Sequence, residues 1–203
     1  MTVKYSIRKE DLNINPYDVL RYLGYAKDRI TEEDERMVDE CIEEAREFLS
    51  PKACYDRYHV ELMDDNRILM PYGEIESKSL SYNLSGCKEI YIFAATIGAS
   101  YDRGIKTMSA RSMAKGSVFN AIGAAAVEEV CDRLNEELRL KSEALGEKLK
   151  TRFSPGYGDL SLDNQKGLFR VLDPAKHAGI TLKDTLIMAP EKSVSAIIGI
   201  YDA

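Results

Sequence analysis

Residues 88–98, KEIYIFAATIG, form the most apolar segment of the chain and predict a buried β-strand. The segment ends at Gly98, and residues 100–114 favour a helix. We therefore interpret Gly98 as a strand-to-helix turn, although such a turn could also expose backbone N–H groups to a ligand. Residues 193–201, SVSAIIGIY, predict a final strand of similar composition.

A hairpin is predicted upstream of this strand. Residues 53–63, ACYDRYHVELM, are rich in β-formers, and Asp64-Asp65-Asn66 is a turn signal before residues 67–70, RILM.

Helical patterns alternate with these strands. Pro16 and Gly24 delimit a short helix over 16–25, and Thr31 with Asp34 forms a capping box before an amphipathic helix. A long helix is predicted from Ser117 to Lys150, its charged second half projecting into solvent, and another over 163–172. We expect one α+β domain over 1–203, mainly antiparallel, with a helical part at about 1–50 and a sheet and long-helix core at about 51–203.

The overall composition excludes several classes of protein. The chain of 203 residues carries a net charge of −6 with no basic stripe, which argues against nucleic-acid binding. Its N-terminus, MTVKYSIRKEDL, has no apolar run, so we expect a cytoplasmic protein that does not enter a membrane. The four cysteines form no CxxC pair and there are two histidines, so we expect buried thiols and no metal site.

No hydrolytic or redox motif is present, which suggests a protein that positions a reactive small molecule. The best candidate site is the loop 152–159, RFSPGYGD. Arg152 could bind a carboxylate through two parallel hydrogen bonds, and Tyr157 could add a stacking face and a hydroxyl. The alternative, which these residues by themselves favour, is a structural turn with a surface salt bridge.

A second candidate lies at 187–199, IMAPEKSVSAIIG. Small residues at Ser193, Ser195 and Ala196 would let a ligand or a helix approach closely, whereas the alternative is an ordinary core strand.

Together these segments resemble the activation domain of cobalamin-dependent methionine synthase, in a stand-alone form. The family pattern begins with an Asp-Arg-Leu-x-Glu helix and an Arg-x-x-x-Gly-Tyr loop, and continues with a helix containing Gln, a Leu-Thr-like strand, Met-x-Pro and Ser-Val-Ser. The matching residues are Asp132-Arg133-Leu134-Asn135-Glu136, Arg152, Gly156-Tyr157, Gln165, Leu168, Leu172, Leu182, Met188, Pro190 and Ser193-Val194-Ser195. The resemblance covers most of the chain and is densest over 120–200.

The resemblance implies a repair function. Such a domain binds S-adenosylmethionine, and its methyl group passes to cobalamin that has been oxidised to Co(II) and reduced again by flavodoxin or another reductant. No cobalamin-binding Asp-x-His-x-x-Gly motif occurs in this chain, so the cobalamin is expected on a partner, a methionine synthase without its own activation domain. The family continues beyond the Ser-Val-Ser strand with further tyrosines, so we expect low affinity here.

Site roles follow from the same resemblance. Arg152 matches the arginine that holds the methionine part of the ligand, and Ser154 and Gly156 are expected to supply backbone contacts. Tyr157 matches the tyrosine near the reacting end and is the expected catalytic residue. Glu136 matches an acid that binds the amino group or the ribose, although an exposed helix glutamate is its rival interpretation. Two other functions remain open: a non-catalytic binding module, and a reactivation partner of another corrinoid methyltransferase.

Overall fold

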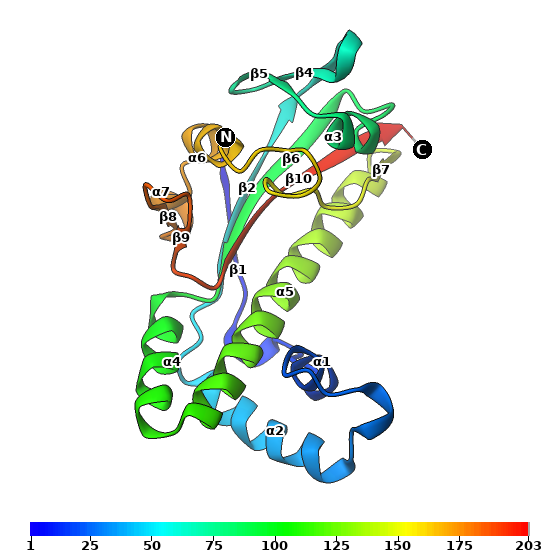
Figure 1. Ribbon diagram of the computed structural model, residues 1–203. Coiled ribbons are helices and arrows are strands. Elements are labelled where there is room, and N and C mark those ends of the chain that lie inside the picture. The colour runs from blue at the N-terminus through cyan, green and yellow to red at the C-terminus, as the bar shows by residue number, and fades with distance from the viewer. Residues whose placement is uncertain (203) are drawn as a thin grey trace.

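The fold is built on a five-stranded antiparallel sheet, which confirms the predicted α+β class (Figure 1). The computed structural model describes residues 1–202. The central strand β6 pairs along its whole length with β2 on one side and β10 on the other. In spatial order the strands are β1 (Val3–Ser6), β2 (Lys52–His59), β6 (Glu89–Thr96), β10 (Ser193–Asp202) and β7 (Glu147–Leu149).

Strand β6 is apolar from Ile90 to Ala95 because both faces of the sheet are covered there. Tyr91, Phe93 and Ala95 point to the face that the long helix covers, whereas Ile90 and Ile92 point to the other face. Because successive side chains of the strand point to opposite faces, β6 contributes to two separate hydrophobic cores.

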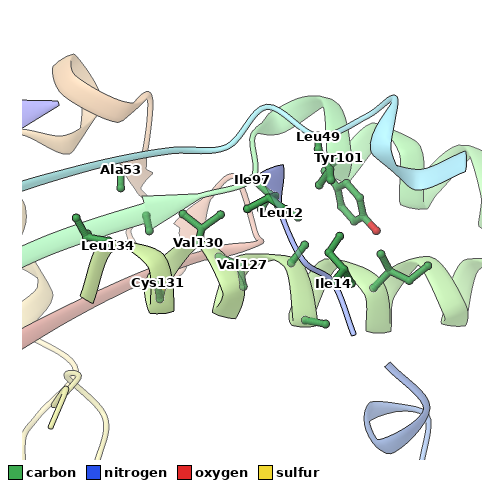
Figure 2. Close-up of a cluster of buried hydrophobic side chains, with 14 of the residues drawn as sticks. Leu12, Ile14, Leu49, Ala53, Ile97, Tyr101, Val127, Val130, Cys131 and Leu134 are labelled. Atoms are coloured by element: carbon green, nitrogen blue, oxygen red, sulfur yellow. The ribbon is translucent and has the colours of Figure 1, made fainter. Parts of the chain in front are cut away.

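The long helix α5 (Met113–Glu143) lies across one face of the sheet (Figures 1 and 2). The predicted end at Lys150 is wrong. The helix ends at Glu143, Gly146 adopts a left-handed φ of 78°, and the chain then turns into β7, which pairs with β10. The second half of the helix does not project into solvent either, since Leu134 and Leu138 are fully buried against the sheet.

Three further helices surround the N-terminal half of α5 (Figure 1). The predicted capping box of Thr31 and Asp34 is present. Gly98 is confirmed as a strand-to-helix turn: a Cβ there would lie 2.9 Å from Ser50 Cβ, so it packs tightly against protein. The helices are α1 (Pro16–Tyr22), α2 (Glu32–Arg46) and α4 (Ala99–Arg111), with 3-10 turns at Lys9–Asp11 and Lys27–Arg29.

The opposite face of the sheet is covered by short elements (Figure 1). The predicted hairpin is only partly present, because residues 52–59 belong to the main sheet and only Glu61–Leu62 pairs with the next strand. These elements are β3 (Glu61–Leu62), a 3-10 turn at Asp64–Asn66, β4 (Arg67–Met70), β5 (Gly73–Glu76), α3 (Lys78–Asn83), α6 (Asn164–Leu172), α7 (Pro174–Ala178), β8 (Thr181–Leu182) and β9 (Met188–Ala189).

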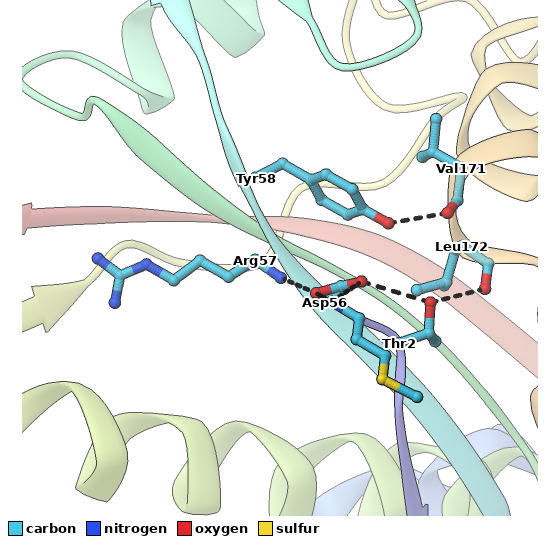
Figure 3. Close-up of polar contacts among 7 residues, drawn as sticks. Thr2, Asp56, Arg57, Tyr58, Val171 and Leu172 are labelled. Atoms are coloured by element: carbon cyan, nitrogen blue, oxygen red, sulfur yellow. Dashed lines mark hydrogen bonds and ion pairs between the residues drawn. The ribbon is translucent and has the colours of Figure 1, made fainter.

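The chain start and the end of α6 meet on strand β2 (Figure 3). Tyr58 donates a hydrogen bond to the carbonyl of Val171 at 2.9 Å, and Thr2 contacts both Asp56 and the carbonyl of Leu172. The N-terminal region is therefore not purely helical, since β1 is an edge strand of the main sheet.

Residues 1–202 can be compared with the expectations about membrane spans, metal sites and cysteines. No helix within residues 1–202 combines the length and apolar character needed to cross a membrane. Nor do these residues contain a group of three or more His, Cys, Asp or Glu arranged to hold a metal ion. Cys54, Cys87 and Cys131 are buried free thiols, as expected, and Cys41 is half-buried.

Candidate functional site

The loop after β7 is attached firmly to the main sheet. The backbone of Phe153 exchanges two hydrogen bonds of 2.8 Å with Ile197 of β10, beyond the end of β7. This bridge fixes the position of Arg152, whose side chain reaches helix α5.

Arg152 has unused hydrogen-bonding capacity. Its Nη2 atom lies 2.8 Å from Asp132 Oδ1 and 3.3 Å from Glu128 Oε2. Its Nη1 atom is buried and has no hydrogen-bond partner. A buried N–H group without an acceptor is costly, so this end of the guanidinium would be stabilised by an acceptor that reached it.

The Arg152 side chain lines a cavity of about 250 Å³. Tyr157 lies at its edge with 70% of its surface exposed, whereas Val194 contributes from strand β10. The cavity is lined by Glu128, Arg152, Phe153, Ser154, Tyr157 and Val194.

The loop itself is held by its own hydrogen bonds. The Gly156 N–H donates to the Leu160 carbonyl at 2.8 Å, and the Tyr157 N–H donates to the Ser154 carbonyl at 3.1 Å. Gly156 has a φ of 95°, which a residue with a side chain rarely adopts. These two backbone groups are thus engaged within the loop; Ser154 lines the cavity, and Gly156 shapes the turn without lining it.

Asp159 ties the other end of the loop to helix α3. Its carboxylate accepts hydrogen bonds from Ser77 Oγ at 2.7 Å, the Lys78 N–H at 2.8 Å and the Ser79 N–H at 3.1 Å. These donors, the Ser77 hydroxyl first, hold the pKa of the Asp159 carboxyl well below its usual value. The loop therefore presents Arg152 from a fixed backbone.

Glu136 lies apart from the cavity lining. Both of its carboxylate oxygens accept hydrogen bonds from Arg139, at 2.6 and 2.7 Å, and this pairing lowers its pKa. The structure brings Arg152, Ser154 and Tyr157 together but pairs Glu136 with its own helix neighbour.

Two acids that the sequence analysis gave no role lie against Arg152 instead. Glu128 and Asp132 are four residues apart on α5, so they lie on one face of the helix. That spacing, on the helix that precedes the arginine loop, is the signal that could have identified them.

The second candidate segment contributes only one side chain to the cavity. Val194 and Ala196 point toward α5, whereas Ser193 bonds to Thr96 and Pro190, and the Oγ of Ser195 is buried without a partner. The two serines therefore lie on the other face of the sheet.

A second cavity, of about 300 Å³, adjoins the first along α5. Glu128 lines both cavities. The N-terminal segment forms its opposite wall, where the Asn13 N–H donates to Glu129 at 3.1 Å. The second cavity is lined by Asn13, Asn15, Asp18, Arg21, Tyr22, Ala125, Glu128, Glu129 and Asp132.

Comparison with solved structures relates this fold to one known domain. The chain is similar to the structure described as the MetH reactivation domain bound to AdoHcy, with a TM-score of 0.74 and 16% sequence identity. The match covers 98% of this chain and 78% of that one. No family model matches the chain, and no curated protein matches it. The likeness shows that the chain has the α+β fold of that reactivation domain.

Proposed function

We propose that this protein binds S-adenosylmethionine in the Arg152 cavity and presents its methyl group to a corrinoid held by a partner protein. The observation that carries the proposal is the buried Nη1 of Arg152, which lacks an acceptor in a side chain that lines a cavity. The fold adds support, because the similar reactivation domain was crystallised with AdoHcy, the demethylated form of the proposed ligand.

The residues of the loop take distinct roles in this proposal. Arg152 holds the carboxylate of the ligand through a charge-assisted hydrogen bond from Nη1. Tyr157, exposed at the edge of the cavity, contacts the reacting end that faces the partner. Ser154 forms part of the cavity wall, and Gly156 supplies the turn that holds Ser154 and Tyr157 in place.

The role that the resemblance assigns to Glu136 is an acidic contact to the ligand, and other residues are better placed for it. Glu128 and Asp132 lie against Arg152, whereas Glu136 is held by Arg139. We therefore place the acidic contacts of the ligand on Glu128 and Asp132.

The chain acts by alignment. The partner's corrinoid supplies the nucleophile that accepts the methyl group, and a reductant such as flavodoxin keeps that nucleophile available. Holding two reactants in a productive geometry lowers a barrier by several kcal/mol, up to roughly 7–11 kcal/mol in well-oriented systems. A loop fixed by Phe153 and Asp159 is suited to this task, since its ligand-binding groups need little reordering.

A second candidate function is a module that binds a corrinoid protein without using S-adenosylmethionine. The observation that favours it is the 2.8 Å ion pair between Arg152 and Asp132, which already occupies one end of the guanidinium. A reactivation partner of another corrinoid methyltransferase would use the same ligand site and differ only in its partner.

The test is reactivation in trans. A methionine synthase lacking its activation domain, with its cobalamin oxidised to Co(II), is mixed with reductant, S-adenosylmethionine and this chain, and the visible spectrum of the corrinoid is followed. We expect the methylated form to appear and turnover to return, and both to depend on the chain. The Arg152→Ala variant should be defective in the same assay. Equal recovery without the chain would contradict the proposal and favour the non-catalytic module.

A further inference from the structure

A larger cavity, of about 820 Å³, lies between helix α3 and the segment that follows β7, and we call it the α3 cavity. Phe153 lines both this cavity and that of Arg152. The volume falls within the roughly 300–1,000 Å³ typical of small-molecule sites. The other lining residues are Lys78, Ser79, Tyr82, Asn83, Ser85 and Lys150. The proposed function makes no use of these residues.

The two walls of the α3 cavity are fixed to each other. Asn83 Nδ2 donates to Thr151 Oγ1 at 3.1 Å, which joins α3 to the segment opposite. The Lys150 N–H donates to the Gly199 carbonyl at 2.8 Å, so this segment is held on β10. The cavity is therefore preformed, and a ligand that entered it would require little reordering of the protein.

Each wall carries one aromatic ring and one lysine. Lys78 and Tyr82 are four residues apart on α3, so their side chains leave the same face of the helix. Lys150 and Phe153 come from the opposite segment. Tyr82 is 86% exposed, so its ring faces solvent and not a hydrophobic core. The cavity thus combines flat apolar surfaces with positive charge.

The two lysines of the α3 cavity are not neutralised by neighbouring acids. Neither Lys78 nor Lys150 forms an ion pair within residues 1–202, and the Lys150 ammonium lies over the Tyr201 ring, 4.6 Å from its centre. The whole chain carries a net charge of −6, so two unpaired cations in one cavity are a local exception. An anion could bind them without displacing an internal carboxylate.

We propose that the α3 cavity binds a mononucleotide, with its base against Tyr82 and Phe153 and its phosphate on Lys78 and Lys150. Every nucleobase has a flat face that stacks on aromatic side chains, and lysine ammonium groups bind phosphate through charge-assisted hydrogen bonds. A nucleic-acid strand fits less well, because the chain has no basic stripe that could follow a phosphate backbone. The site is independent of the S-adenosylmethionine site proposed above.

Calorimetric titration with guanosine 5′-monophosphate tests the proposal. Guanine is chosen because adenosine is part of the ligand proposed for the Arg152 cavity. We expect one saturable site per chain at millimolar concentration or below. Guanosine lacks the phosphate and ribose 5-phosphate lacks the base, so each should bind at least about tenfold more weakly. The affinity for the nucleotide should also fall in 1 M salt, which screens the attraction between phosphate and lysine.

Variants of α3 locate the binding site. Tyr82→Ala should weaken nucleotide binding by about tenfold, whereas Tyr82→Phe keeps the ring and should stay within about twofold of the unmodified chain. Lys78→Gln should weaken it by about fivefold. Lys183→Gln is the matched control, because Lys183 is exposed and lies outside the cavity lining. Tyr82 and Lys78 are both exposed, so these variants should keep the fold.

Three results would overturn the proposal. The first is no binding of guanosine 5′-monophosphate at millimolar concentration, or binding that Tyr82→Ala leaves unchanged. The second is equal affinity for ribose 5-phosphate, which would make the cavity a plain anion site without a role for the rings. The third is a single-stranded oligonucleotide that binds more than about tenfold more tightly than the mononucleotide, which would identify a nucleic-acid site. None of these results bears on S-adenosylmethionine binding, which is measured separately.

Discussion

Arg152 shows how a single side chain can serve both the fold and a ligand. Its guanidinium bridges two carboxylates of α5 through Nη2 while Nη1 stays buried without an acceptor. The loop sequence pointed to Arg152 and Tyr157, and the family resemblance added Ser154 and Gly156. Of these four residues Arg152, Ser154 and Tyr157 line one cavity, and Gly156 does not. Glu128 and Asp132 were harder to predict, because the acid that meets the loop depends on how α5 is rotated against the sheet.

Replacing Arg152 with alanine should weaken S-adenosylmethionine binding and preserve the fold. A charge-assisted hydrogen bond to a carboxylate contributes about 1.5–3 kcal/mol, and we expect a loss of that size in calorimetry. Arg152→Lys keeps the charge but lacks the planar guanidinium, so its affinity should lie between those of the unmodified chain and Arg152→Ala. Unchanged affinity, or a variant that no longer shows a cooperative thermal transition, would make Arg152 a structural residue.

Tyr157→Phe should slow methyl transfer in trans more than it weakens binding. The ring remains at the edge of the cavity, and only the hydroxyl, which we place near the reacting end, is lost. Removing one hydrogen bond of about 0.5–1.5 kcal/mol predicts a two- to tenfold lower rate at saturating ligand. Stopped-flow measurement of the corrinoid spectrum would report it. The control is Glu143→Gln, at the C-terminal end of α5 and outside the cavity lining. Equal rates for the two variants would show that the Tyr157 hydroxyl does not act at the reacting end.

Among the elements, those with a strong local sequence pattern were predicted correctly. Strands that form only by pairing with distant residues were not. Strands β6 and β10, the Thr31 capping box and helix α6 follow from composition and periodicity in single windows. The predicted end of α5 at Lys150 lies seven residues too late because the leucines and charged residues continue a helical pattern past Glu143. Strand β7 exists through its pairing with β10, some fifty residues away in the chain, which no local window contains.

Helix α5 should tolerate no side chain at Gly123, although alanine is the better helix former. A Cβ at this position would lie 2.5 Å from Cε1 of Tyr101. That ring is fully buried and its hydroxyl donates to the Phe119 carbonyl at 2.8 Å, so it cannot move aside cheaply. Overpacking destabilises by about 1–3 kcal/mol, whereas the higher helix propensity of alanine stabilises by about 1 kcal/mol. We therefore expect the free energy of unfolding of Gly123→Ala to be lower by up to about 2 kcal/mol. Urea unfolding measures it, and a Gly123→Ala variant of higher stability would contradict this packing.

The link between the site loop and α3 should depend on pH through Asp159. Its folded-state pKa is lowered by the donors at Ser77, Lys78 and Ser79, so its contribution to stability is fully present above the unfolded pKa of about 3.9. The contribution is lost as pH falls through the lower folded-state value. Asp159→Asn should therefore be less stable than the unmodified chain at pH 7, and the difference should narrow at pH 3. A difference in denaturation midpoint that is the same at both pH values would show that the carboxylate charge has no part in it.

On the scale of the whole molecule, the candidate site depends on three parts of the chain that the sheet brings together. Helix α5 supplies Glu128, the loop after β7 supplies Arg152 and Tyr157, and β10 supplies Val194. The N-terminal segment adds the wall of the adjoining cavity. Because β1 and the helices after it pack on the same core as α5, the fold positions this wall without a separate N-terminal unit.

A calorimetric titration would show whether the cavity of Arg152 is a site for S-adenosylmethionine. S-adenosylmethionine at millimolar concentration is titrated into the isolated chain without added metal. We expect one saturable site per chain and a rise in the thermal unfolding midpoint on binding. Both the affinity and the rise should be clearly smaller in Arg152→Ala. The absence of both heat and thermal shift at that concentration would contradict it.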